Sequence, residues 1–136
     1  MRVTVHIDGG SRGNPGPAAA GVVITSDGKV LHQAGIFLGQ ATNNIAEYHG
    51  LLAGLEAAGR LRASEVQVIS DSELLVRQMN GQYRVRNEGI KPLYEKASRL
   101  ASAFARCEFC HVPREKNTRA DELVNKALDL KRNVRG

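Results

Sequence analysis

The sequence predicts a single α/β domain, residues 1–136, with a five-stranded mixed sheet flanked by helices. Three observations point to this fold class. Three strand-like segments come first, and helical patterns then alternate with short apolar runs, which favours parallel pairing later in the chain. With 136 residues, 42% hydrophobic and 24% charged, the chain has the size and composition of one globular domain with an ordinary core. The predicted element order is β-β-β-α-β-α-α-β-α.

The first third of the chain is predicted to form three consecutive strands. Apolar and polar residues alternate over residues 2–7, which predicts a half-buried strand that ends at Asp8, directly before a glycine-rich turn. Residues 18–25 and 29–38 are two further apolar runs. The Ser-Asp-Gly segment between them, residues 26–28, is a strong hairpin signal, so we expect the two runs to pair as antiparallel strands.

A helix is predicted to follow these strands. Asn43 or Asn44 is expected to cap it, and it runs to about Arg60. Its apolar stripe consists of Ile45, Tyr48, Leu52 and Leu55. The stripe indicates that one side of this helix packs against the sheet.

Strands and helices alternate through the rest of the chain. The pattern predicts a buried strand at 66–70, a helix that opens at 71–73, a long helix at 87–105 with Pro92 in its first turns, a strand at 107–113 and a last helix from Thr118. The last helix is expected to end in a basic tail, residues 131–135. A strand that follows a helix in this way is typical of a parallel crossover.

Charge and hydropathy narrow the class of protein. Lys and Arg exceed Asp and Glu by 19 to 14, a net charge of +5, which is a mild indication of an anionic partner. No segment approaches the roughly 18 consecutive apolar residues of a membrane span, and the N-terminus reaches a charge too early for a signal peptide. We therefore expect a cytoplasmic protein with no membrane partner. Trp is absent and aromatic residues make up 4% of the chain, which argues against an aromatic stacking platform for single-stranded nucleic acid.

Cys107 and Cys110 stand in a C-x-x-C spacing, which allows a redox pair or half of a zinc site. They fall on a predicted strand, where residues three apart point to opposite faces, whereas a redox pair normally opens a helix. Two buried or half-buried thiols are the favoured interpretation.

Four acidic residues are notable for their positions in the predicted elements. Asp8 and Asp71 each follow an apolar strand, and the carboxyl ends of strands are where ligands bind in open α/β sheets. Glu47 falls on the side of its helix that points toward the sheet. Asp121 lies in the first turn of the last helix, nearly in line with Leu128, so it borders the packed face.

Taken one at a time, these residues have ordinary structural explanations. Asp8 suits a turn before glycine, Asp71 suits a helix cap, and Asp121 suits the positive end of a helix dipole. Four carboxylates near one crevice have no such structural explanation, because like charges about 4 Å apart repel by a few kcal/mol even at an effective dielectric near 20. Mg²⁺ prefers such oxygen ligands, and two ions roughly 3.5 to 4 Å apart catalyse phosphodiester displacement.

Four segments resemble the successive motifs of type 1 ribonuclease H, and the resemblance covers nearly the whole chain. They are Asp-Gly-Gly-Ser-Arg-Gly-Asn-Pro-Gly-Pro at 8–17, Thr-Asn-Asn-Ile-Ala-Glu at 42–47, Ser-Asp-Ser at 70–72, and Asn-Thr-Arg-Ala-Asp-Glu-Leu-Val at 117–124. The resemblance implies the ribonuclease H-like fold and an endonuclease that cleaves the RNA strand of RNA/DNA hybrids, leaving 3′-hydroxyl and 5′-phosphate ends. It also implies two Mg²⁺ ions, with Mn²⁺ as the alternative.

The resemblance assigns roles to individual residues. Asp8 matches the acid that bridges both ions, Glu47 and Asp71 match the ligands of the ion near the leaving group, and Asp121 matches a ligand of the nucleophile's ion. The positions that match substrate contacts are Gly10, Ser11, Asn14, Asn43, Asn44 and Ser72. An Asn amide suits a ribose 2′-hydroxyl, which distinguishes RNA from DNA, because it both donates and accepts. The glycines at 9, 10, 13 and 16 are expected to let the backbone approach nucleic acid closely.

The sequence departs from better-known members of this family at three places. The loop 113–120 is short and lacks a histidine, for which Arg114, Glu115 or Lys116 are candidate substitutes. The basic protrusion before the long helix is missing, which leaves Arg84 and Arg86 as candidate phosphate contacts or as solvated loop residues. Glu73 stands where Gln is common. We expect a monomeric catalytic domain without a separate hybrid-binding domain.

Two alternatives remain open from the sequence. One is a nuclease of the same fold with another substrate, such as double-stranded RNA or a DNA junction, because fold alone does not fix substrate. The other is a non-catalytic hybrid-binding module, which the four acids disfavour because negative charge weakens binding to a polyanion.

Overall fold

The sheet has six strands in the order β5-β4-β1-β2-β3-β6 in the computed structural model, which describes residues 1–135. Gly136, the last residue of the predicted domain, lies outside the described residues. The strands are β1 (Arg2–Ser11), β2 (Gly16–Ser26), β3 (Lys29–Ala41), β4 (Glu65–Ser70), β5 (Arg106–His111) and β6 (Val134–Arg135). The helices are α1 (Asn43–Arg60), α2 (Glu73–Met79), α3 (Lys91–Ser102) and α4 (Thr118–Leu130), with one 3₁₀ turn, η1 (Arg114–Lys116).

The predicted α/β class and mixed sheet are confirmed. β1, β2 and β3 pair antiparallel, whereas β4 pairs parallel to β1 and β5 parallel to β4. The strand count of five was wrong by one. β6 pairs antiparallel with Ala34 and Gly35 of β3, and two residues are too few for any periodicity to reveal.

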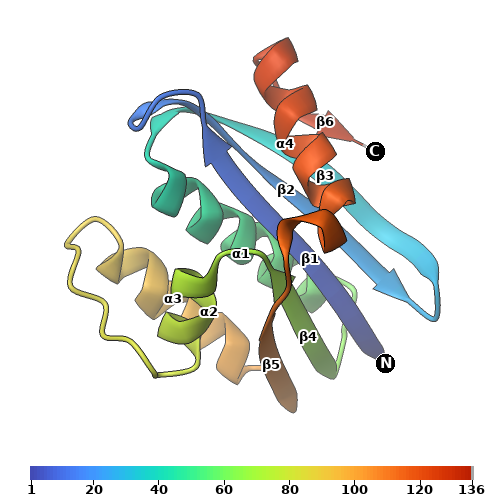
Figure 1. Ribbon diagram of the computed structural model, residues 1–136. Helices are drawn as coiled ribbons and strands as arrows, with labels where there is room; N and C mark the ends of the chain where they lie inside the picture. Colours follow the sequence, from blue (N-terminus) through green and yellow to red (C-terminus); the bar gives the residue numbers. More distant parts are fainter. Residues whose placement is uncertain (136) are drawn as a thin grey trace.

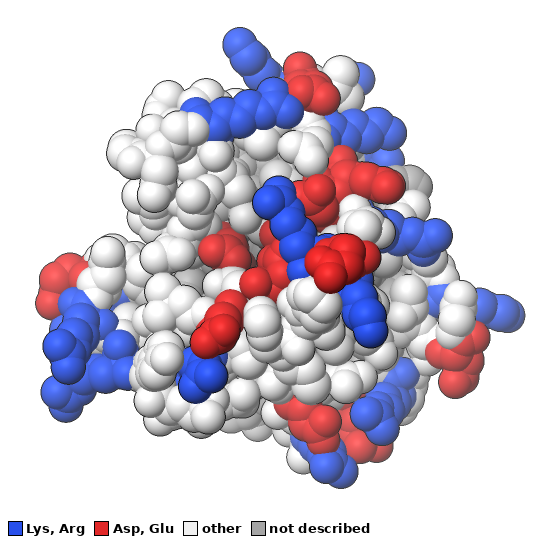
Figure 2. Space-filling view, viewed as in Figure 1, with Lys and Arg blue, Asp and Glu red and all other residues white. Residues whose placement is uncertain are grey.

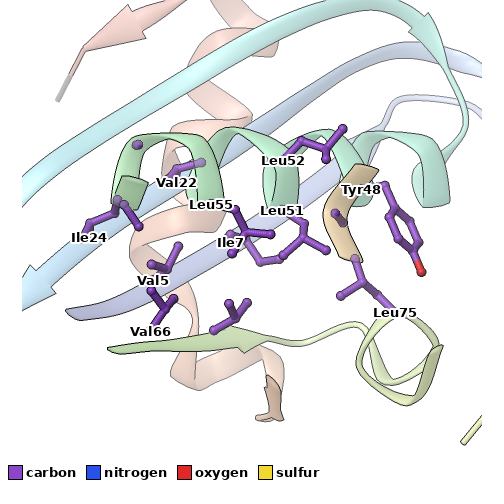
Figure 3. Close-up of a cluster of buried hydrophobic side chains, with 14 of the residues drawn as sticks. Val5, Ile7, Val22, Ile24, Tyr48, Leu51, Leu52, Leu55, Val66 and Leu75 are labelled. Atoms are coloured by element: carbon purple, nitrogen blue, oxygen red, sulfur yellow. The ribbon is translucent and has the colours of Figure 1, made fainter. Parts of the chain in front are cut away.

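Helices cover both faces of the sheet (Figure 1). α4 lies across one face against β2 and β3, and α1 lies on the other with α3 beside it. The main core fills the space between α1 and the strands (Figure 3). Its side chains include Val5, Ile7, Val22, Leu51, Leu55 and Val66, all at most 2% exposed.

The turn between β2 and β3 confirms the hairpin prediction. Asp27 and Gly28 form a two-residue loop between the paired residues Ser26 and Lys29. Both have positive φ angles, 50° and 78°, as the type I′ turn requires.

The predicted boundaries of the first helix and the long helix need correction. Thr42, and not Asn43 or Asn44, caps α1, because its Oγ1 accepts the N–H of Ile45 at 3.2 Å. α3 covers 91–102 and not 87–105. Asn87 instead holds a turn, with its Oδ1 accepting the N–H of Gly89 at 2.8 Å.

The strand predicted to end at Asp8 continues through Gly9 and Gly10 to Ser11, which pairs with Ala18. The two glycines were interpreted as a turn, but β2 provides a partner for each of them. The strand predicted at 107–113 ends two residues earlier, at His111.

Gly9 allows α1 to lie directly on β1. A Cβ atom at Gly9 would lie 2.3 Å from the backbone of Ala46 and Glu47. At Gly16 a Cβ would lie 2.2 Å from the carbonyl oxygen of Arg12. The interpretation that these two glycines make room for nucleic acid was therefore wrong, since the chain's own backbone occupies the space.

Across residues 1–135 no helix combines the length and the apolar character needed to cross a membrane.

We predict that Gly9→Ala destabilises the protein by about 1 to 3 kcal/mol, because the new methyl group must push α1 away from the sheet. Gly10→Ala is the matched control, since a Cβ there meets only Val124 Cγ1 at 3.8 Å, an ordinary contact. Urea unfolding of both variants measures the difference. Equal stabilities for the two variants would contradict the helix-to-strand contact described above.

Candidate active site

The four acids of the sequence prediction line one cleft with a volume of about 610 Å³. Asp8 comes from β1, Glu47 from α1, Asp71 from the residue after β4, and Asp121 from α4. Figure 2 shows acidic side chains gathered in the hollowed middle of this face, with Lys and Arg side chains around them. Four elements that are far apart in the sequence thus meet at one place.

The cleft lies where β1 and β4 separate. Their parallel pairing ends at His6 and Ile69, so the next residues of both strands are no longer paired with each other. Asp8 is only 8% exposed, on the face of β1 opposite Gly9. At the end of β4, Ser70 Oγ accepts the N–H of Ser72 at 3.0 Å, which turns the chain so that Asp71 borders the cleft.

Glu47 and Asp121 reach the cleft from helices on opposite faces of the sheet. The contact of Gly9 with the backbone of Ala46 and Glu47 brings Glu47 to the cleft that Asp8 also lines. Asp121 lies in the first turn of α4, where its N–H donates to the carbonyl oxygen of Asn117 at 3.2 Å.

Asn117 connects these two parts of the site, and the sequence prediction missed it. Its Nδ2 donates to the carbonyl oxygen of Ile7 at 2.8 Å, and the residue is 2% exposed. That carbonyl lies one residue beyond the end of the β1–β4 pairing, so Asn117 supplies the partner that β4 no longer offers. The side chain therefore ties the peptide before Asp8 to the start of α4. An Asn before a helix normally suggests a cap, which is why sequence patterns do not reveal this contact.

The crowding of carboxylates changes their acidity. Burial, the negative charge of Asp71 and a hydrogen bond with Asp121 raise the pKa of Asp8 to about 8. Burial also raises the pKa of Glu47 to about 7; Asp71 adds to this shift, and a hydrogen bond from Ser72 opposes it. Ionising the whole set at neutral pH therefore costs free energy unless positive charge enters the cleft.

Two arginines line the cleft in the described part of the chain, and each faces a carboxylate of α4. Arg114 Nη2 lies 3.5 Å from Asp121 Oδ1, at the edge of hydrogen-bond distance. Arg12 Nη2 lies 2.7 Å from Asp129 Oδ1. Of the candidate substitutes for a loop histidine, only Arg114 lines the cleft; Glu115 and Lys116 do not.

The predicted substrate-contact residues surround the acids. Gly10, Ser11, Asn43 and Asn44 line the cleft, and Asn44 and Ser72 line a smaller adjoining pocket. Asn14 is exposed and lines neither pocket, but its Oδ1 accepts the N–H of Asn43 at 3.0 Å. Ser11 donates to Asn43 Oδ1 through its N–H at 2.8 Å and its Oγ at 3.0 Å. These bonds fix the start of α1 against the end of β1.

Other residues singled out in the sequence lie outside the acidic cleft. Arg84 and Arg86 are exposed in the loop between α2 and α3, and Glu73 pairs with Arg77 at 3.0 Å. Cys107 and Cys110 are half-buried free thiols, as predicted. Burial raises the pKa of the Cys107 thiol to about 11, which disfavours a reactive thiolate.

The chain is similar in sequence to a known protein family and to proteins of known sequence. A family model described as "Reverse transcriptase-like" matches residues 6–127. A bifunctional protein of Mycobacterium tuberculosis is 49% identical over 95% of this chain, but the chain spans only 36% of that relative's length. Ribonuclease HI of Halobacterium salinarum is 41% identical to this chain, and the match covers 94% of this chain and 65% of that relative's length.

A solved structure agrees with these matches. The chain resembles an RNase H1 (LC11) crystallised in complex with an RNA/DNA hybrid, with a TM-score of 0.90 and 44% identity over 95% of this chain and 98% of that one. The family model covers most of the chain, and the likeness to RNase H1 holds in both sequence and fold. This chain therefore belongs to the type 1 ribonuclease H family.

Proposed function

We propose that this chain is a metal-dependent endoribonuclease that hydrolyses the RNA strand of RNA/DNA hybrids, leaving 3′-hydroxyl and 5′-phosphate ends. The observation that carries the proposal is the meeting of four carboxylates in one cleft, where burial and mutual repulsion raise the pKa values of Asp8 and Glu47. The crystallised complex of a similar RNase H1 with such a hybrid supports the choice of substrate. The expected monomeric state and cytoplasmic location stay predictions.

The donor set fits hard divalent cations. It consists of carboxylate oxygens, which Mg²⁺ and Mn²⁺ prefer. The two arginines that line the cleft in the described part of the chain carry too little positive charge to balance the four acids. Among residues 1–135, no group of three or more His, Cys, Asp or Glu side chains is placed so that it could hold a metal ion by itself. That is compatible with Mg²⁺, which retains waters and takes part of its coordination from substrate phosphate.

We assign Asp8, Glu47, Asp71 and Asp121 as the residues that would hold two such ions. Asp8 would be shared between them, Glu47 and Asp71 would serve the leaving-group side, and Asp121 the side of the attacking water. Bound ions of this kind supply an activated water and stabilise the charge that develops on the leaving oxygen. Asp8 and Glu47 must give up their protons on ion binding, because their raised pKa values keep them partly protonated near neutral pH.

The polar residues around the acids would distinguish RNA from DNA. Asn43 uses its carbonyl oxygen to accept two bonds from Ser11, so its NH₂ group is the part of this side chain that can donate to a ribose 2′-hydroxyl. Gly10, with no side chain, allows a ribose close to the strand, and Asn44 and Ser72 line the adjoining pocket.

Cleavage of matched duplexes, each labelled on one strand, tests the function. We expect Mg²⁺-dependent cleavage confined to the RNA strand of RNA/DNA, with a 5′-phosphate on the downstream product. Double-stranded RNA and DNA are the comparison substrates. Equal rates on all three duplexes, or cleavage of a DNA strand, would contradict hybrid specificity, and binding without any cleavage would favour the non-catalytic alternative.

Asp71→Asn should abolish turnover and leave hybrid binding unchanged or tighter. The variant loses an ionic ligand, while removal of one negative charge reduces repulsion of the polyanion. Asp27→Asn is the matched control, because it makes the same chemical change in the exposed β2–β3 turn. Steady-state rates and fluorescence anisotropy measure the two effects. Near-normal turnover of Asp71→Asn in Mg²⁺ would contradict the assignment of Asp71 as an ion ligand.

Removal of metal should make stability depend on pH. The pKa values of Asp8 and Glu47 lie at about 8 and about 7 in the folded chain, against ordinary values of 3.8 and 4.5. The folded chain therefore binds more protons than the unfolded chain between about pH 4 and pH 8, and its stability falls as pH rises through that window.

Thermal unfolding in EDTA from pH 5 to pH 8 measures this effect. We expect Tm to decrease with pH in EDTA, and added Mg²⁺ to raise Tm most at the higher pH values. The Asp8→Asn variant should show a shallower decrease, because it lacks one of the two groups. An equal slope in that variant would show that the pH dependence arises elsewhere.

A further inference from the structure

The contact between Arg12 and Asp129 has no part in the proposed ion site. Arg12 lines the cleft, whereas Asp129 does not, although the two side chains meet at 2.7 Å. The pair joins the turn after β1 to the last turn of α4, 117 residues apart in the sequence. Of the two arginines that line the cleft within residues 1–135, Arg12 is thus the one whose carboxylate partner is outside the proposed metal ligands.

The backbone around Arg12 is firmly held. Its N–H donates to the carbonyl oxygen of Pro17 at 2.8 Å, and Gly16 packs so closely on the Arg12 carbonyl that a Cβ would lie 2.2 Å away. Gly13 has a φ of +94°, which few other residues adopt. The turn therefore presents the Arg12 side chain from a fixed position, while that side chain itself is 50% exposed and both lines the cleft and contacts Asp129.

The ion pair is inexpensive to break. Its side chains are 50% and 65% exposed, and pairs as exposed as this contribute little because water and salt screen them. A backbone phosphate offers a guanidinium a charge-assisted contact that is often bidentate, as a carboxylate does. A polyanion that enters the cleft can therefore compete with Asp129 for Arg12.

We propose that Arg12 binds a phosphate of the nucleic-acid backbone, and that Asp129 is an intramolecular competitor for the same guanidinium. The Arg12–Asp129 pair is closed in the free chain and open in the complex with substrate. Asp129 in this way lowers the affinity for substrate without taking part in the reaction. The inference rests on the proposed function only in taking the RNA/DNA hybrid as the polyanion.

A double-mutant cycle tests the competition. Hybrid Kd is measured by fluorescence anisotropy for Arg12→Ala, Asp129→Asn and the double variant, each with Asp71→Asn to prevent cleavage. We expect Asp129→Asn to tighten Kd about threefold, in line with the small worth of an exposed pair. Arg12→Ala should weaken Kd and reduce the slope of log Kd against log salt by about 0.9, the loss of one phosphate contact.

The double variant gives the decisive result. If Asp129 acts through Arg12, Asp129→Asn has no effect once Arg12 is Ala. An equal tightening in both backgrounds would overturn the proposal, because Asp129 would then act only as a negative charge near the cleft. An Arg12→Ala variant with unchanged Kd and salt slope would overturn it as well.

Glu56→Gln is the matched charge control, because it removes one exposed carboxylate paired to Lys96 at 3.8 Å, outside the residues that line the cleft. It should leave Kd unchanged. Failure of the proposed function has a different signature: the parent chain would cleave no hybrid, while the binding cycle would still decide whether Arg12 and Asp129 compete.

Discussion

The close contact of α1 with β1 determines the geometry of the whole site. Glycines provide it from both sides, since a Cβ at Gly9 would meet the α1 backbone at 2.3 Å and a Cβ at Gly50 would meet the carbonyl oxygen of Asp8 at 2.7 Å. Glycine has no side chain, so at these two positions nothing holds the backbones of the helix and the strand apart. Glu47 is therefore brought to the cleft that Asp8 lines by a backbone contact, which permits less adjustment than packed side chains do.

α4 repeats this arrangement on the other face. Gly21 of β2 would place a Cβ 2.3 Å from the carbonyl oxygen of Ala120, and Gly35 of β3 would place one 2.5 Å from that of Leu123. The first contact is at the residue before Asp121. Two helices on opposite faces are thus fixed by glycines, each next to one of the acids, and Asn117 joins the second helix to the strand that carries Asp8. The scaffold holds like charges together because its backbone contacts leave them little room to separate.

Patterns local in sequence predicted most of the fold, and contacts distant in sequence account for the rest. Periodicity located the four helices and every strand except the shortest one, and Asp27-Gly28 identified the hairpin. These signals depend on neighbours along the chain. The rule that ligands bind at strand ends selected Asp8 and Asp71 as candidates. The bond from Asn117 to Ile7 joins residues 110 positions apart, and no local pattern encodes it. The turn predicted at Gly9 and Gly10 was wrong for the same reason, because their strand conformation depends on a partner in β2.

The charges of the cleft follow from the position of α4. This helix carries Asp121 and Asp129, eight residues or about 12 Å apart along its axis, and each faces one of the arginines that line the cleft. Near Asp121 the excess is negative, because Asp8, Glu47 and Asp71 border the same space and Arg114 is the single cation among the described lining residues there. Asp129, outside the cleft lining, forms a one-to-one ion pair with Arg12. Under the proposed function, a polyanion would therefore be held at one end by replacing a carboxylate on an arginine, and at the other when cations neutralise the acids, which would make substrate binding and ion binding interdependent.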